Sequence, residues 1–158
     1  MPKSNFERMI ELADEVFNTR QDPNQLDVNE EVIAQLQALH PATLSEYDDG
    51  NGPVVWILLI PTTQGLMSRF LEGDITEKEL LDLTPADAEF EAIYLCSALV
   101  LAEYRRKGIA KQLTLDAIEN IRRAHPIKWL FVWTFSKEGE LAADTVAKET
   151  GLKLFKRK

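Results

Sequence analysis

The stretch LVLAEYRRKGIA, residues 99–110, joins a predicted strand to a predicted helix and is the most informative part of the chain about its fold. The apolar run 93–101 predicts the strand, and the amphipathic pattern from residue 109 onward predicts the helix. Three consecutive cations, Arg105 to Lys107, and Gly108 stand between them. Backbone N–H groups at a helix N-terminus lack intrahelical partners, and the helix dipole favours negative charge there. Because Gly108 lets the backbone approach a ligand closely, the stretch predicts an anion-binding turn.

These three cations are electrostatically unfavourable at a helix start unless an anion binds there, because that end of the dipole is positive. The chain as a whole is acidic, with 26 Asp and Glu against 18 Lys and Arg and a net charge of −8. This charge argues against nucleic acids and anionic membranes as partners. A second basic cluster at 153–158 is interpreted as a solubility feature or as protection of a strand edge. The internal cluster is therefore the stronger functional indication.

The composition predicts one soluble domain over residues 1–158. A length of 158 residues suffices for one core, and 45% apolar with 28% charged residues is typical of globular proteins. The longest purely apolar run, 54–60, is too short for a membrane span, and the N-terminus lacks the apolar core of a signal peptide. A single cysteine excludes an internal disulfide and a cysteine-based zinc site. We expect a cytoplasmic location and no metal.

Two helices are predicted at the start of the chain. The first covers 4–17 and is capped by Ser4, with Glu7 completing a capping box. Its apolar face consists of Phe6, Met9, Ile10, Ala13, Val16 and Phe17. After a loop at 21–24, the second helix covers 28–39, with Asp27 as its cap. Its buried stripe consists of Val32, Ile33, Leu36 and Leu39, and His40 and Pro41 end it.

Residues 48–90 predict a turn, a strand and short helices. The turn DDGNG at 48–52 precedes the run 54–60, which has no polar face and is therefore expected to be a central strand. A short helix is expected over 66–71, and further helices are expected to start at Thr76 and Thr84.

The second half of the chain alternates strands and helices. The expected strands cover 92–101, 129–134 and 152–155, and the helices cover 109–123 and 138–150, with Gly151 ending the last one. This order predicts a sheet with crossover helices, hence an α/β (α+β) fold.

The spacing Arg105-x-x-Gly108-x-Ala110 resembles the Q/R-x-x-G-x-G/A motif of the GCN5-related N-acetyltransferases. The resemblance covers about residues 92–155, including ETGLKLF at 149–155. It implies a central mixed sheet flanked by helices, with an atypical N-terminal half. No first strand is recognised there, and helical sequence replaces the usual hairpin partner of strand 54–60. The family's seventh strand is not recognised either.

The resemblance implies acetyl-CoA as co-substrate. The N–H groups of 106–110 would hold the pyrophosphate, and the cations 105–107 would neutralise the phosphates. The family splays the strand that carries Val100, often with a bulge, so that backbone groups near Leu99 and Leu101 bond the pantetheine amides. The implied cofactor-binding residues are Leu99, Val100, Leu101, Arg105, Arg106, Lys107, Gly108, Ile109 and Ala110. A solvated basic turn and a normal strand ladder are the alternatives.

Amine acetylation needs an uncharged nitrogen, so a base or water must take a proton. The family position for a carboxylate base corresponds here to Tyr94, with Cys96 one step along the same face. Glu91, near the start of the strand, is the second candidate base, although it also fits a surface carboxylate. The family often places a tyrosine acid four residues before the late glycine, where this chain has Ala147. Tyr104 falls in the turn instead.

Other conspicuous side chains have structural explanations. Cys96 is expected to pack rather than to act as a nucleophile, since no histidine lies near it in sequence. His40 and His125 both precede proline at helix ends, where helix capping is expected rather than metal binding. Trp129, Phe131 and Trp133 alternate along one strand and are expected to form core or cleft wall.

The resemblance implies an N-acetyltransferase that moves acetyl from acetyl-CoA to an amine by direct attack in a ternary complex. The acidic chain favours a cationic acceptor. The alternative is a catalytically silent acyl-CoA-binding or regulatory domain, for which the missing acid and the unusual first half speak. Expected partners are acetyl-CoA and the amine, with no nucleic acid and no membrane; a homodimer is left open.

Overall fold

The computed structural model describes residues 3–20, 30–134 and 136–157, with the backbone alone at 16–20. In this part of the chain one mixed sheet contains five strands in chain order. They are β1 (Leu44–Asp48), β2 (Pro53–Thr62), β3 (Ala92–Val100), β4 (Trp129–Val132) and β5 (Lys153–Lys156). The first three strands pair antiparallel, whereas β3–β4 and β4–β5 pair parallel. The expected α/β fold with a mixed sheet is confirmed.

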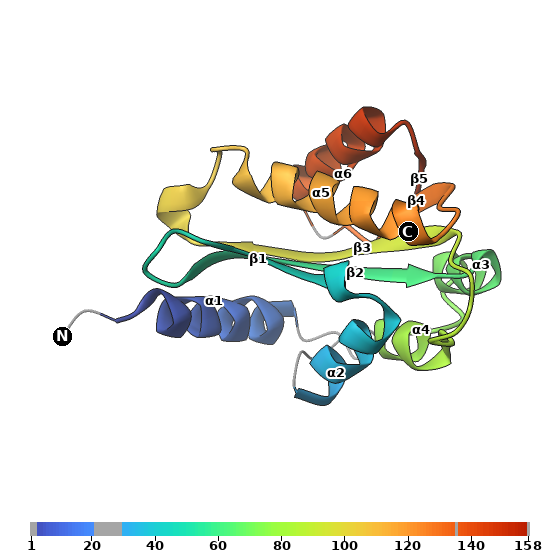
Figure 1. Ribbon diagram of the computed structural model, residues 1–158, viewed down its shortest axis with the longest axis horizontal. Coiled ribbons are helices and arrows are strands. Elements are labelled where there is room, and N and C mark those ends of the chain that lie inside the picture. The colour runs from blue at the N-terminus through green and yellow to red at the C-terminus, as the bar shows by residue number, and fades with distance from the viewer. Residues whose placement is uncertain (1–2, 21–29, 135, 158) are drawn as a thin grey trace.

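Helices cover both faces of the sheet (Figure 1). One face carries α1 (Asn5–Arg20), α2 (Glu30–Leu39) and α4 (Glu77–Leu83), and the other carries α5 (Ile109–Ala124) and α6 (Lys137–Thr150). The short helix α3 (Gln64–Leu71) lies at one end of the sheet. Two 3-10 turns complete the described elements: η1 (Pro41–Thr43) directly precedes β1, and η2 (Ala102–Tyr104) lies between β3 and α5. Among the described helices, none combines the length and apolarity that crossing a bilayer requires.

The first half contains a hairpin that the sequence pattern did not reveal. β1 pairs antiparallel with β2, so the strand at 54–60 does have a hairpin partner. The turn between them is built by Asp48, whose Oδ1 accepts the N–H groups of Gly50 at 2.7 Å and Gly52 at 3.1 Å. β1 was missed because its sequence, LSEYD, is half-exposed and only five residues long. The helical sequence expected beside this strand is also present, as α3 and α4 between β2 and β3.

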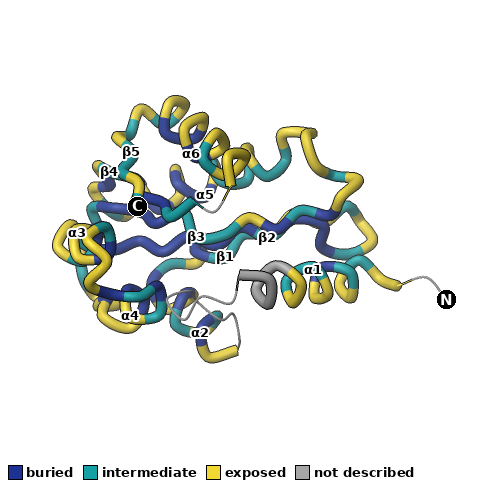
Figure 2. The backbone as a smooth tube through the Cα atoms, turned by 180° about the vertical axis from the view of Figure 1, so that it is seen from behind, coloured by how far each residue is buried: buried dark blue, intermediate teal, exposed yellow. Residues whose placement is uncertain are grey.

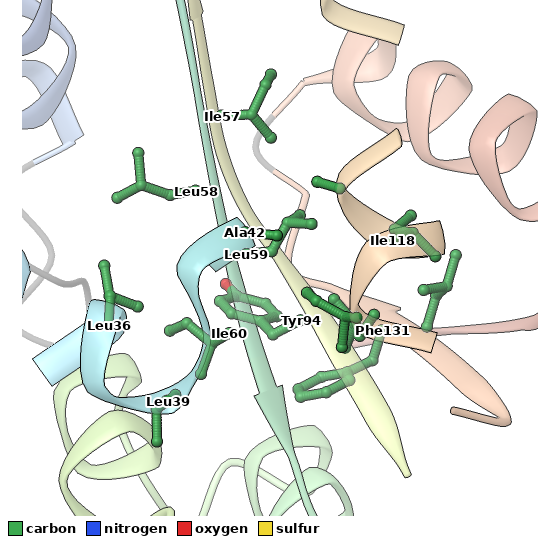
Figure 3. Close-up of a cluster of buried hydrophobic side chains, with 14 of the residues drawn as sticks. Leu36, Leu39, Ala42, Ile57, Leu58, Leu59, Ile60, Tyr94, Ile118 and Phe131 are labelled. Atoms are coloured by element: carbon green, nitrogen blue, oxygen red, sulfur yellow. The ribbon is translucent and has the colours of Figure 1, made fainter. Parts of the chain in front are cut away.

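The core lies against both faces of β2, which confirms its central position. Val54, Val55 and residues 57–60 are at most 2% exposed. The buried tube segments in Figure 2 run along the sheet beneath the helices, and Figure 3 shows Ile57 to Ile60 among the apolar side chains of neighbouring elements. The two βα crossovers follow from the second-half pattern and form as expected.

Some N-terminal expectations were wrong in detail. Met9 is fully buried, but Phe6 and Ile10 are 56% and 42% exposed, so the buried face of α1 is narrower than its apolar pattern. Ser4 Oγ does accept the Glu7 N–H at 3.1 Å. Thr84 ends α4 instead of starting a helix, because its hydroxyl bonds the Leu80 carbonyl at 2.7 Å within the core. The loop at 21–24, the Asp27 cap and Val28, and the side chains of Val16 and Phe17, lie outside the described residues.

The two histidine rings meet edge to face, with ring centroids 6.3 Å apart. His40 Nδ1 accepts the Ala42 N–H at 3.0 Å and so caps η1, and His125 Nδ1 accepts the Phe90 N–H at 3.2 Å. Capping is thus the role of His40, though at a helix start rather than at a helix end. Burial, and then the nearby His125, lower the pKa of His40 below 6.5.

We expect His40 to make stability fall in mild acid. Because the folded state depresses the pKa of His40, its contribution is complete above the unfolded pKa of 6.5 and is lost as pH falls towards the folded pKa. His40→Asn retains a capping oxygen but cannot titrate, so it should lose less stability on acidification. Urea unfolding of both proteins at pH 7.5 and about pH 5.5 tests this. An equal loss in the two proteins would show that His40 does not contribute.

Candidate active site

β3 and β4 pair over only part of their length. Three residue pairs join them, from Ala92 with Trp129 to Tyr94 with Phe131. Beyond Tyr94 the described chain gives β3 no partner strand on this side. Cys96 forms a bulge at this point, because Leu58 pairs with Ser97 while Leu59 pairs with Leu95. The carboxyl half of β3 therefore has a free edge, the arrangement that the family resemblance implies.

An open cleft of about 700 Å³ occupies the space where the pairing stops. Its walls come from residues 95–98 of β3, the turn before α5, residues 132–134 at the end of β4, and the first part of α6. Ala98 is exposed although it lies within a strand, since the neighbouring strand is missing. The cleft thus brings together segments that are distant in sequence.

The basic turn forms one wall of this cleft. Gly108 and Arg106 both have left-handed backbone conformations, with φ of +77° and +63°. The hydrogen-bond ladder of α5 begins at Gln112, whose N–H donates to the Gly108 carbonyl at 3.0 Å. The N–H groups of residues 109–111, at the start of α5, therefore have no intrahelical acceptor. With Arg105, Arg106 and Lys111 also lining the cleft, this wall suits a multiply charged anion.

The backbone groups that β3 presents to the cleft belong to residues one position away from the expected Leu99 and Leu101. The Leu101 N–H donates to the Val54 carbonyl at 3.0 Å, so it faces β2 and is unavailable to a ligand. Because strand backbone groups alternate in direction, Leu99 also faces β2. The Val100 carbonyl faces the other way and accepts from Arg105 Nε at 3.2 Å. Ala98 and Val100, rather than Leu99 and Leu101, therefore present backbone groups to the cleft.

The same architecture occurs in a solved acetyltransferase. No protein-family model matches the chain, and no curated protein is detectably similar to it. Naa20 from Chaetomium thermophilum, solved with a bisubstrate analogue, superposes with a TM-score of 0.52 at 15% identity, covering 89% of this chain. The chain has the GCN5-related N-acetyltransferase fold. A NatB acetyltransferase complex bound to a bisubstrate inhibitor gives a TM-score of 0.49 at 16% identity, over 85% of this chain and 66% of that one. The chain spans 64% of the length of the Naa20 chain.

Neither predicted base of this acetyltransferase fold lies in the cleft. Tyr94 is 1% exposed, packs among Ile60 and Phe131 (Figure 3), and donates its hydroxyl to Glu77. Burial, and then the Glu77 charge, raise the pKa of Tyr94 well above 10.0, so it cannot act as a base at neutral pH. Glu91 directly precedes β3, and its carbonyl accepts the Lys128 N–H at 2.7 Å. It is five residues from the bulge, about 16 Å along the strand, and does not line the cleft.

The position at which the family often has its tyrosine acid does not line the cleft. Ala147 is 8% exposed and faces the sheet, whereas Ala142, Ala143 and Val146 line the cleft from α6. A tyrosine at 147 would therefore enter the core instead of reaching a thioester. Tyr104 does line the cleft, but its phenol donates to Asp49, and this hydrogen bond raises the pKa of Tyr104.

Contacts outside the cleft hold the basic turn in place. Tyr104 bonds Asp49 of the β1–β2 turn, and Glu103 accepts both contacts from Arg8 Nη2 of α1, at 2.6 and 2.7 Å. Lys107 lies over the Tyr104 ring at 5.7 Å and is not among the cleft-lining residues. The unusual first half of the chain thus supports the basic turn through Arg8 and Asp49.

Several polar cleft residues were not predicted from sequence. Ser97, Thr134, Ser136 and Glu138 all line it, and Glu138 is the carboxylate among the described lining residues. Ser136 caps α6, since its Oγ accepts the Gly139 N–H at 3.0 Å, and this serine is the local signal that could have placed the helix start here. Cys96 also lines the cleft, at the bulge. In the described part of the chain, no cluster of three or more metal-ligating side chains occurs.

Proposed function

We propose that this protein is an N-acetyltransferase that moves the acetyl group of acetyl-CoA to an amine. The observation that carries the proposal is the junction of the open β3 edge with the basic N-terminus of α5, around Arg105, Arg106 and Gly108. Each half of acetyl-CoA has a complementary surface there. The diphosphate suits free N–H groups and cations, and the pantetheine amides suit an unpaired strand edge.

In this proposal the N–H groups of 106–111 and the side chains of Arg105 and Arg106 bind the phosphates. The pantetheine arm runs along β3 as an added strand and bonds the backbone of Ala98 and Val100. The apolar end of the cleft, near Leu95 and Val132, then receives the thioester.

The chemistry needs little from the protein beyond positioning. A neutral amine nitrogen attacks the thioester carbonyl, the C–S bond breaks, and the CoA thiolate leaves with the electron pair. The proton of the new amide nitrogen passes to water. A thiol pKa near 8.5 makes the thiolate an acceptable leaving group without a dedicated acid. Direct attack in a ternary complex is therefore the proposed route, with proximity as the main source of rate.

A turnover assay with a panel of amines tests the activity. We expect thiol release from acetyl-CoA that depends on the amine, with acetylated amine identified by mass spectrometry. The alternative is a catalytically silent acyl-CoA-binding domain, and calorimetry separates the two. Saturable CoA binding with no acetylated product from any amine would replace the enzyme with the binding domain.

We expect Cys96→Ala to keep most of its turnover, apart from a small packing loss. Cys96 lines the cleft at the bulge, but neither histidine lines the cleft to activate its thiol. Initial-velocity kinetics should show the intersecting pattern of a ternary complex, and Ser97→Ala is the matched control at the neighbouring position. An acetylated Cys96 peptide together with ping-pong kinetics would contradict direct attack.

A further inference from the structure

Arg157 places its guanidinium against two aromatic rings. Its guanidinium carbon lies 4.5 Å from the ring centroid of Phe70 and 4.1 Å from that of Trp133. The two rings are 6.1 Å apart and nearly perpendicular to each other. Nη1 also donates to the Ile75 carbonyl at 3.3 Å. We call Phe70, Trp133 and the Ile75 carbonyl the aromatic seat; together they form a site for a cation.

The aromatic seat adjoins the cleft. Trp133 directly follows β4 and lines the cleft where the pairing of β3 and β4 stops. Phe70 contacts the ring of Tyr94 at 4.8 Å between centroids, and Tyr94 bonds Glu77, a carboxylate that is only 3% exposed. The negative faces of such aromatic rings favour a cation in front of them. Trp133 therefore belongs to the aromatic seat and also lines the cleft that is proposed to hold the thioester.

Arg157 can leave the aromatic seat without unfolding the sheet. It lies one residue beyond the end of β5 and is half-buried. Its backbone N–H donates to the Val132 carbonyl at 2.9 Å, which anchors the main chain while the side chain rotates. The contact of its guanidinium with Phe70 places this side chain against α3.

We propose that the aromatic seat binds a cationic group of the acceptor, and that Arg157 is a tethered competitor that fills it when no acceptor is bound. The role as acceptor site rests on the proposed acetyl transfer. The reacting nitrogen must be neutral, whereas the seat favours charge, so the bound cation is a second group of the same molecule. The acceptor class is therefore an amine that carries a further ammonium or guanidinium, such as an aliphatic diamine.

Binding without CoA tests the aromatic seat directly. The probe is 1,4-diaminobutane, and the readout is the indole N–H resonance of Trp133, assigned with Trp133→Phe. Arg157→Gln removes the competitor, and we expect it to bind the probe roughly two- to thirty-fold more tightly than the wild type. Lys153→Gln is the matched control, since Lys153 also lies over a ring, that of Phe155 at 5.0 Å, but away from the seat. The neutral isostere 1,4-butanediol should not shift the resonance.

A second measurement uses the wild type and Arg157→Lys, both of which keep the positive charge at position 157. Saturating diamine should move the Arg157 Nε–H resonance of the wild type towards that of a solvated arginine, and Arg157→Lys should bind like the wild type. An unchanged Trp133 signal in Arg157→Gln, an equal response to butanediol, or an unmoved Arg157 resonance in saturated wild type would overturn the proposal.

Kinetics separate this proposal from the proposed function. With acetyl-CoA, Arg157→Gln should lower the KM for 1,4-diaminobutane and leave the KM for n-butylamine unchanged. Turnover with an unchanged ratio of the two KM values would overturn the acceptor role while acetyl transfer stands. Trp133 titration without turnover of any amine would instead overturn acetyl transfer and leave the cation site in place.

Discussion

Gly108→Glu is expected to abolish CoA binding. A glutamate here places a carboxylate beside the free N–H groups of α5, where the phosphates are proposed to bind. Like-charge contact of this kind costs several kcal/mol, so the Kd should rise by roughly 100-fold or more. The added Cβ itself would meet no atom within 4 Å, so the effect is electrostatic rather than steric. Isothermal titration calorimetry with CoA measures it.

Gly151→Glu is the matched control for backbone strain. Gly151 ends α6 with φ of +73°, close to the +77° of Gly108, and a Cβ there also meets no atom within 4 Å. Both substitutions therefore carry the same left-handed penalty, of about 1 kcal/mol. Only Gly108→Glu should lose CoA. Unchanged affinity in Gly108→Glu, or an equal loss in both variants, would rule out the turn as the phosphate site.

Tyr94→Phe is expected to destabilise the fold and to spare catalysis. The substitution removes the hydroxyl that donates to Glu77 and leaves a buried carboxylate short of a donor. Such a loss costs about 1–3 kcal/mol in the free energy of unfolding. Because the phenol is buried and its pKa is raised, turnover per folded molecule should stay near that of the wild type.

Urea unfolding and steady-state kinetics on the same preparations test the two halves of this expectation. Tyr47→Phe is the control, since the Tyr47 side chain is 42% exposed on β1 and its hydroxyl contributes little to the core. Suppose that Tyr94→Phe kept full stability but lost most of its kcat/KM, or removed an alkaline limb from the pH profile. Tyr94 would then be a catalytic group, and its structural role would be refuted.

The parts of the fold that were predictable are those with strong local signals. The second half combines apolar periodicity with caps, such as Ser136 and Gly151, and its elements form within a few residues of their expected bounds. β1 shows neither an apolar periodicity nor a capping residue. Its five residues become a strand because β2 offers pairing partners and the Asp48 turn closes the hairpin. Tertiary pairing overrides weak local propensity in such segments.

The candidate site likewise contains residues that local sequence identifies and residues that only long-range contacts bring there. The cation–glycine turn is a local feature, so its residues could be named from the sequence. Tyr94 was misplaced because counting along a strand shows which residues share a face, but not whether that face meets a cleft or a packed helix. The bulge at Cys96 also shifts the alternation of side chains between the two ends of β3. Glu138 and Trp133 enter the site only because two strands stop pairing.

Local sequence features sufficed to predict the basic turn, the order of the strands and helices in the second half, and the central place of the 54–60 run. These follow from helix termini, periodicity and apolar runs, which act over a few residues. Long-range packing sets the opening between β3 and β4, the burial of Tyr94 against Glu77, and the contact of Arg157 with Phe70 and Trp133. Those contacts join residues from 17 to 87 positions apart, beyond the reach of local patterns.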